Sequence, residues 1–127
     1  MIKNALIVGL GGGAGSMLRY LASLLALRYC AGWFPWATWT VNVLGCLLAG
    51  MLFTLWGHAA DATARLLWLA GFCGGFTTFS AFAVENMQCM QTGEYGKIIC
   101  YTSASILSGF AAVWLGTAIL KTIKHVF

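Results

Sequence analysis

Four apolar segments, each long enough to cross a lipid bilayer, occupy most of this 127-residue chain. A helix needs about 20 apolar residues to cross a hydrocarbon layer of roughly 30 Å. The segments that meet this requirement are residues 4–27, 36–56, 65–91 and 98–120. The connections between them are short and leave no room for an extramembrane domain. The sequence therefore predicts an all-α membrane protein, with four transmembrane helices in a single domain that spans residues 1–127.

The composition agrees with this fold and argues against several classes of function. Hydrophobic residues make up 61% of the chain and charged residues only 8%, far from the average of soluble proteins. The basic residues are scattered singly and do not cluster as a nucleic-acid surface requires, so we expect no nucleic-acid partner. The cysteines form no C-x-x-C pair, which argues against a zinc or disulfide role. The sequence contains no phosphate-binding loop and no catalytic triad, and we expect no enzymatic activity.

The third apolar segment contains the sequence GFCGGFTTFS at residues 71–80, which sets a glycine pair beside three hydroxyls. A continuous helix over the whole segment would be roughly 40 Å long, longer than the hydrocarbon requires unless it tilts. An interruption at residues 74–80 would remove this excess. A helix can be broken inside a bilayer only where the freed backbone groups face protein, water or an ion. We therefore expect a functional break near the membrane midplane.

Polar side chains on the second and fourth segments suggest a path for an ion. Asn42 has two N–H donors and a carbonyl acceptor, so it can either join helices or donate to an anion, and helix joining is the default. Tyr101, Ser105 and Ser108 share one helical face at i, i+4 and i+7. Their hydroxyls can either bond to carbonyls of their own helix or form a row of donors.

An arginine and two phenylalanines each allow two interpretations. Arg19 lies nine residues before Arg28, so it can snorkel or pair structurally, or it can stand at a pore mouth. Phe79 and Phe82 would share one face of a helix. They can be ordinary core residues, or their positive ring edges can contact a small anion.

The distribution of charge suggests assembly from two copies. The side with both termini carries Lys3, Arg65, Lys121 and Lys124, and the opposite side carries Arg28 and Lys97. So small a difference in the number of basic residues between the two sides permits insertion in both orientations. Four helices are also too few to enclose a hydrated pore. Two copies in opposite orientations would form a closed dimer with its two-fold axis in the membrane plane.

Three stretches of the chain together resemble the small bacterial fluoride channels of the Fluc or CrcB family. They are residues 11–20, which end in Arg-Tyr, residues 38–50 with Thr-x-x-Val-Asn-x-x-Gly, and residues 71–85 with Gly-Gly-Phe-Thr-Thr-Phe-Ser. Each motif alone is modest, but all three occur in the family's order and with its four spans. The resemblance extends over nearly the whole chain.

The resemblance implies a dual-topology antiparallel homodimer with two fluoride pores and a sodium ion at its centre. Backbone carbonyls of Gly74 and Thr77 from both subunits would hold the sodium. The residues that match the family's fluoride pathway are Asn42, Phe79, Ser80, Phe82 and Tyr101, with Arg19 and Glu85 as pore-mouth or structural residues. The chain departs from the family at Ala81, Ala83 and Gly109, where hydroxyls are common. Ser105 and Ser108 are the neighbours that could supply donors instead.

The resulting hypothesis is a channel of the bacterial inner membrane that exports cytoplasmic fluoride passively and so relieves its toxicity. Two alternatives remain open. A small proton-coupled multidrug transporter would also be short and four-spanning, but it would require a deep carboxylate in its first span. A membrane scaffold protein without transport activity would not require Asn42, Ser80 or the pair of phenylalanines.

Overall fold

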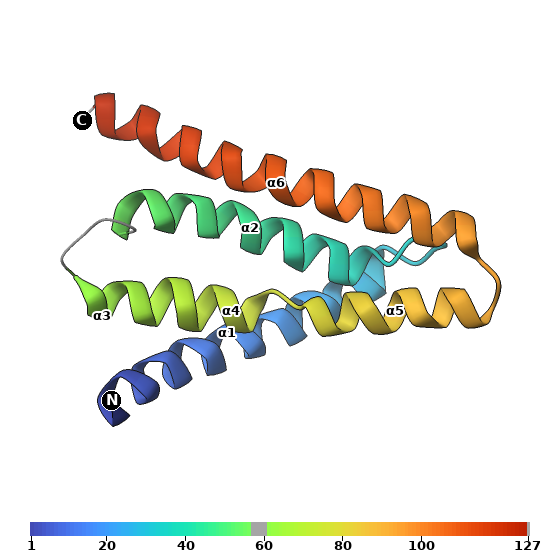
Figure 1. Cartoon of the computed structure of the whole chain (residues 1–127), viewed down its shortest axis with the longest axis horizontal. Coiled ribbons are helices and arrows are strands. Elements are labelled where there is room, and N and C mark those ends of the chain that lie inside the picture. Colours follow the sequence, from blue (N-terminus) through green and yellow to red (C-terminus); the bar gives the residue numbers. More distant parts are fainter. Residues whose placement is uncertain (57–60, 127) are drawn as a thin grey trace.

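The computed structural model describes residues 1–56 and 61–126, and all regular secondary-structure elements in these residues are helices (Figure 1). The helices of the first, second and fourth spans are α1 (Ile2–Tyr29), α2 (Trp36–Trp56) and α6 (Tyr95–Val126). The third span is divided into α3 (Ala62–Ala64), the π-helical segment η1 (Arg65–Cys73), α4 (Gly74–Phe76) and α5 (Phe79–Gln91).

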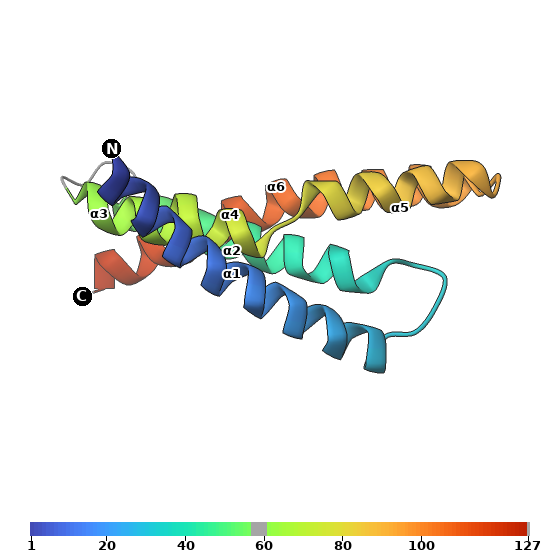
Figure 2. The same ribbon diagram turned by 90° about the horizontal axis from the view of Figure 1, so that it is seen from below.

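The expected set of four membrane-spanning helices is confirmed. Four helices, Ile2–Tyr29, Trp36–Trp56, Ala62–Gln91 and Tyr95–Val126, are long and apolar enough to cross a bilayer. The first and the last extend beyond the expected segments at both ends. The two termini lie at one end of the bundle, and the α1–α2 connection and the α5–α6 turn lie at the other (Figure 1, Figure 2).

Large apolar side chains cover the outside of the bundle. Leu10, Phe110 and Trp114 are 73%, 76% and 71% exposed in the single chain. Exposed apolar surface on this scale marks contact with a membrane or with another protein. The fold of one copy therefore leaves much of its apolar surface for lipid or a partner.

Glycines hold α1 directly against the third span. A methyl group at Gly11 would collide with the carbonyl oxygen of Leu67, and one at Gly75 with that of Gly12. Small residues allow helix backbones to approach this closely in lipid. The backbones of α1, η1 and α4 are therefore in direct contact.

Substitution of Gly11 by alanine should destabilise the protein, because its surroundings are backbone atoms that cannot move aside. Overpacking of this kind typically lowers the free energy of unfolding by about 1–3 kcal/mol. Gly13→Ala is the matched control, because a methyl group there would meet no atom within 4 Å, and it should be neutral or stabilising by up to about 1 kcal/mol. Unfolding in detergent measures both variants, and equal effects would contradict the close contact.

The break in the third span is shorter than the sequence suggested. Only Thr77 and Thr78 are extended, with ψ of 156° and 112°, while Gly74–Phe76 remains helical. The expectation of an interruption over residues 74–80 was therefore wrong in its extent. Gly75 serves close packing against α1, and the helix resumes at Phe79 because the Thr78 side chain caps α5.

Candidate functional site

The break is held by an asparagine from another helix. Asn42 of α2 donates from Nδ2 to the Thr78 carbonyl at 3.0 Å, and the Thr78 N–H donates to Asn42 Oδ1 at 2.7 Å. The Thr78 hydroxyl accepts from the Ala81 N–H at 3.2 Å. Backbone groups freed by a break in lipid require partners of this kind. The Asn42 side chain therefore joins α2 to the break in the third span.

These side-chain contacts release two backbone carbonyls from helical pairing. In a continuous α-helix the Thr78 N–H would donate to the Gly74 carbonyl and the Ala81 N–H to the Thr77 carbonyl. Here both N–H groups donate to side-chain oxygens instead. Carbonyl oxygens without their helical donors are suitable ligands for a hard cation. Gly74 and Thr77 are the residues that the family resemblance implies as sodium ligands, so the donor set fits such an ion.

Arg19 makes a structural contact at the same break. Its Nε donates to the Gly75 carbonyl at 3.1 Å, and the Ser16 hydroxyl approaches the same oxygen at 3.4 Å. In a continuous helix that carbonyl would accept from the Phe79 N–H. Arg19 and Ser16 therefore tie α1 to the break, which agrees with the structural interpretation of this arginine.

A cleft of about 280 Å³ opens beside the break. Four residues expected in the fluoride pathway line it, namely Asn42, Phe79, Phe82 and Ser105, together with Cys46, Thr77, Thr78 and Ile106. The two phenyl rings have centroids 5.7 Å apart, and Phe79 is 79% exposed. The structure thus gathers an amide, a hydroxyl and two phenyl rings around one opening.

Ser105 is the one side chain of the described residues with a buried polar atom that lacks a hydrogen-bond partner. A buried hydroxyl left unpaired costs about 1–3 kcal/mol, and such groups in native structures mark strain, function or a bound molecule. Because Ser105 also lines the cleft, its hydroxyl is available as a donor to an anion there.

The other two serines of the pathway are already engaged. The Ser108 hydroxyl accepts from Trp39 Nε1 at 3.1 Å and donates to the Ala104 carbonyl of its own helix. The Ser80 hydroxyl lies 3.3 Å from the Thr78 hydroxyl, and neither Ser80 nor Ser108 is among the residues that line the cleft. On α6, the Ser108 hydroxyl therefore has a structural role, whereas the Ser105 hydroxyl has no hydrogen-bond partner.

Ser105→Ala and Ser108→Ala should consequently differ in their effects on stability, and only Ser108→Ala should be destabilising. Removal of the unpaired Ser105 hydroxyl should leave the free energy of unfolding unchanged or raise it by up to about 1 kcal/mol. Removal of the Ser108 hydroxyl should lower it by about 1 kcal/mol, because the Trp39 donor loses its acceptor. Chemical unfolding in detergent measures both. A clear destabilisation by Ser105→Ala would show that its hydroxyl has a structural partner.

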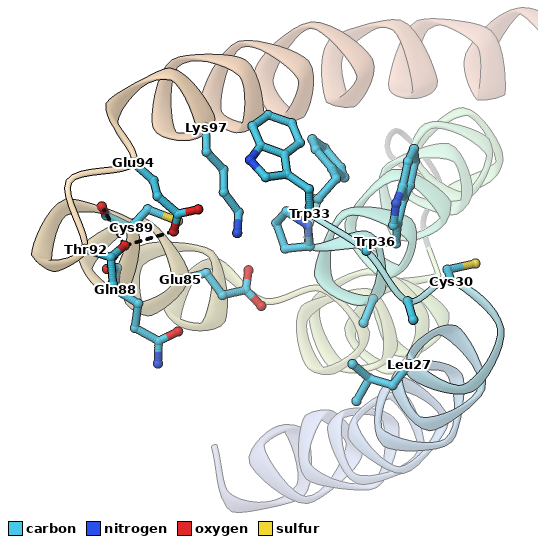
Figure 3. Close-up of a pocket in the computed structure, with 15 residues that line it drawn as sticks. Leu27, Cys30, Trp33, Trp36, Glu85, Gln88, Cys89, Thr92, Glu94 and Lys97 are labelled. Atoms are coloured by element: carbon cyan, nitrogen blue, oxygen red, sulfur yellow. Dashed lines mark hydrogen bonds between the residues drawn. The ribbon is translucent and has the colours of Figure 1, made fainter.

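A hydrogen-bonded group links α2, α5 and α6 next to the cleft. The Thr38 hydroxyl donates to Glu85 Oε1 at 2.5 Å, and the Tyr101 hydroxyl donates to Glu85 Oε2 at 2.6 Å. Tyr101 is fully buried, and its ring centroid lies 5.0 Å from that of Phe82. Glu85 also lines a second cavity of about 390 Å³ at the loop end of the bundle (Figure 3). The polar residues therefore continue from the cleft to this cavity.

Two residues of the site were not identified from the sequence. Thr38 was noted only as the first residue of the Thr-x-x-Val-Asn-x-x-Gly motif. Its spacing of four from Asn42 could have indicated that both side chains lie on one face of α2. Thr78 was noted only as part of the segment expected to be broken. Because threonine is a preferred N-cap residue, it could have been predicted as the residue that begins the second half of the span. In the described residues no group of three or more His, Cys, Asp and Glu side chains could hold a metal ion.

Comparison with known proteins agrees with the three sequence motifs. The family model described as "CrcB-like protein, Camphor Resistance (CrcB)" matches residues 6–117. A relative from Azobacteroides pseudotrichonymphae is 44% identical over 91% of this chain and 94% of its own length. Relatives from Phocaeicola vulgatus and Flavobacterium psychrophilum are 41% and 39% identical, over 91% and 94% of this chain and 96% and 98% of their own lengths. All three are named fluoride-specific ion channel FluC. As its three motifs predict, the chain belongs to the CrcB family.

Proposed function

We propose that the chain is a fluoride channel of the bacterial inner membrane, through which fluoride leaves the cytoplasm passively. The relatives' shared name supports fluoride as the ion. Membership of an ion-channel family also confirms the expectation that the chain is not an enzyme. The observation that carries the proposal is the cleft beside the break, where Asn42 meets the unpaired Ser105 hydroxyl and two ring edges.

The cleft offers the chemistry that a dehydrated fluoride ion requires. Fluoride is small and strongly hydrated, so a pore must replace its water with N–H and O–H donors at hydrogen-bond distance. One N–H of the Asn42 amide is used by Thr78, and the second is available for the ion. Ser105 supplies an O–H, and Phe79 and Phe82 supply positive ring edges. A narrow path lined by rigid rings disfavours the larger chloride ion.

Membrane potential is sufficient to drive export. Hydrofluoric acid is a weak acid that enters cells uncharged and dissociates inside. An interior that is negative by 100 mV then favours outward movement of each fluoride by about 2.3 kcal/mol. A passive pathway therefore requires no nucleotide and no coupled ion.

The proposed assembly is an antiparallel homodimer with two pores. Its support is the exposed apolar surface of the single chain, including Phe79 at the cleft, and the weak charge bias between the two ends. The cleft is open on the side of Phe79, so a second copy would complete its wall. Accessibility of tags at both termini tests the orientation, and labelling of every copy from one side only would exclude the antiparallel arrangement.

The proposed sodium ion would be held by the carbonyls of Gly74 and Thr77. Two carbonyls from each of two copies would provide four oxygens, and the bound cation would hold the two breaks together at the dimer centre. Replacement of sodium by N-methylglucamine on both sides of a liposome membrane should slow fluoride release about tenfold or more, because repulsion between the unneutralised carbonyls weakens the assembly. A fluoride electrode measures the rate, and sodium should restore it. Equal rates with and without sodium would exclude a required sodium.

Fluoride tolerance of cells tests the proposed function directly. A bacterium without a fluoride exporter should grow in the presence of fluoride when it expresses this chain. The Asn42→Ala variant, expressed at the same level in the membrane, should not protect it. Absence of protection by wild-type protein that has reached the membrane would contradict the proposal.

A further inference from the structure

The cavity at the loop end of the bundle has aromatic walls and a small set of charges. Its volume is about 390 Å³, and Trp33 of the α1–α2 connection and Trp36 at the start of α2 lie on one side of it (Figure 3). Phe34 also lines the cavity. Lys97 of α6 extends into it, and Glu85 and Glu94 also line it. Glu85, which lines this cavity, accepts a hydrogen bond from Tyr101, which packs on Phe82 of the cleft. One set of contacting side chains therefore extends from the cleft to this cavity.

The carboxylates of the cavity are engaged by hydroxyl groups, whereas the ammonium is not engaged by a carboxylate. Glu85 accepts from two hydroxyls, and Glu94 accepts from the Thr92 hydroxyl at 2.9 Å. The Lys97 ammonium lies 6.0 Å from the centroid of the Trp33 ring, a cation–π contact at the outer limit of its range. Within residues 1–56 and 61–126 it forms no ion pair. Its charge therefore remains available to a mobile anion.

We propose that Lys97 attracts fluoride to this mouth of the pore and offsets the repulsion from Glu85. The proposal rests on the proposed function and adds to it a residue that sets the rate of access. A carboxylate beside an anion pathway repels the anion. A cation in the same cavity lowers that electrostatic barrier, and without Lys97 only the two carboxylates would remain among the charged side chains that line the cavity.

Coulomb's law gives the size of the expected effect. A unit charge about 6 Å from the ion in a water-filled mouth changes its energy by ~0.7 kcal/mol, which corresponds to roughly a threefold change in local fluoride concentration. This interaction is screened by salt. The screening length falls from about 30 Å at 0.01 M to about 8 Å at 0.15 M ionic strength. A charge effect must therefore shrink as salt is added, whereas the effect of a purely structural lysine would not.

Fluoride release from liposomes tests this role with three variants of the full chain. Lys97→Gln removes the charge, Lys97→Arg keeps it, and Lys121→Gln removes an exposed charge from the opposite end of the bundle. Fluoride is kept at low concentration, and ionic strength is adjusted with potassium isethionate. Lys97→Gln should be roughly threefold slower than wild type at low ionic strength and approach it at high ionic strength. Lys97→Arg and Lys121→Gln should match wild type throughout.

The other outcomes separate the two proposals. A Lys97→Gln rate equal to wild type at low ionic strength, or reduced by the same factor at every ionic strength, would overturn the role of Lys97 and leave the channel proposal intact. Absence of fluoride release from wild-type vesicles would overturn the proposed function and, with it, the role of this lysine.

Discussion

Replacement of Asn42 by alanine should abolish most fluoride conduction, the largest effect expected of any single substitution in this chain. The Asn42 side chain pairs with both the N–H and the carbonyl of Thr78, so alanine leaves two backbone groups unpaired at the break. Two hydrogen bonds of ~1 kcal/mol each amount to ~2 kcal/mol. This lowers the equilibrium constant in favour of the correctly broken helix by roughly 30-fold, and the population of that state falls with it. The same substitution removes an N–H donor from the cleft, so conduction should fall further than the population does.

Asn86→Ala is the matched control for this prediction. The Asn86 amide donates to the Phe82 carbonyl of its own helix and makes only a 3.5 Å contact with Thr102 of α6. Asn86→Ala should slow fluoride release from liposomes, but by a factor severalfold smaller than Asn42→Ala does. Both variants must elute as folded protein on gel filtration before their rates of fluoride release are compared. Conduction by folded Asn42→Ala at the wild-type rate would remove this residue from the pathway.

Tyr101→Phe should give the second large effect, this time on stability. The Tyr101 hydroxyl is the donor to Glu85 Oε2, and the side chain is fully buried. Hydrogen bonds to charged groups contribute about 1.5–3 kcal/mol, and the Glu85 carboxylate would lose one of its two hydroxyl donors, the one at Oε2. We expect the free energy of unfolding in detergent to fall by that amount.

A double-mutant cycle with Glu85→Gln isolates this contact. The two substitutions should be less than additive, because either one alone already weakens the same hydrogen bond. Tyr95→Phe serves as control, since Tyr95 is 62% exposed and loss of its hydroxyl should change stability by less than about 0.5 kcal/mol. Full additivity of Tyr101→Phe and Glu85→Gln would show that the two residues act independently.

The four helices could be predicted from the sequence because the lipid imposes a length and an apolar composition that are read directly from the residues. The extent of the break could not. A glycine pair is compatible with a helix end and equally with close packing, and only the position of α1 shows that Gly75 serves packing. The capping function of Thr78 depends on Asn42, which lies 36 residues earlier in the chain.

The serines of α6 show the same limit for the site. Ser105 and Ser108 lie on one helical face, and their spacing in the sequence gives no reason to expect different roles for them. They differ in the structure because Trp39 of α2 reaches Ser108, whereas the Ser105 hydroxyl is left without a partner. Likewise, Glu85 could be named as a pore-mouth or structural residue from the family motif. Its pairing with Thr38 and Tyr101 depends on the packing of three helices, which no local pattern reveals.

Selective fluoride release is the most direct test of the account. Purified wild-type protein is placed in liposomes loaded with either fluoride or chloride, and a potassium ionophore is added to balance charge. The account predicts rapid fluoride release without measurable chloride release, without a proton gradient, and with loss of the signal in Asn42→Ala. A multidrug-type transporter would instead require a proton gradient, and a scaffold protein would release neither ion. Absence of fluoride release from vesicles shown to contain folded protein would contradict the channel proposal.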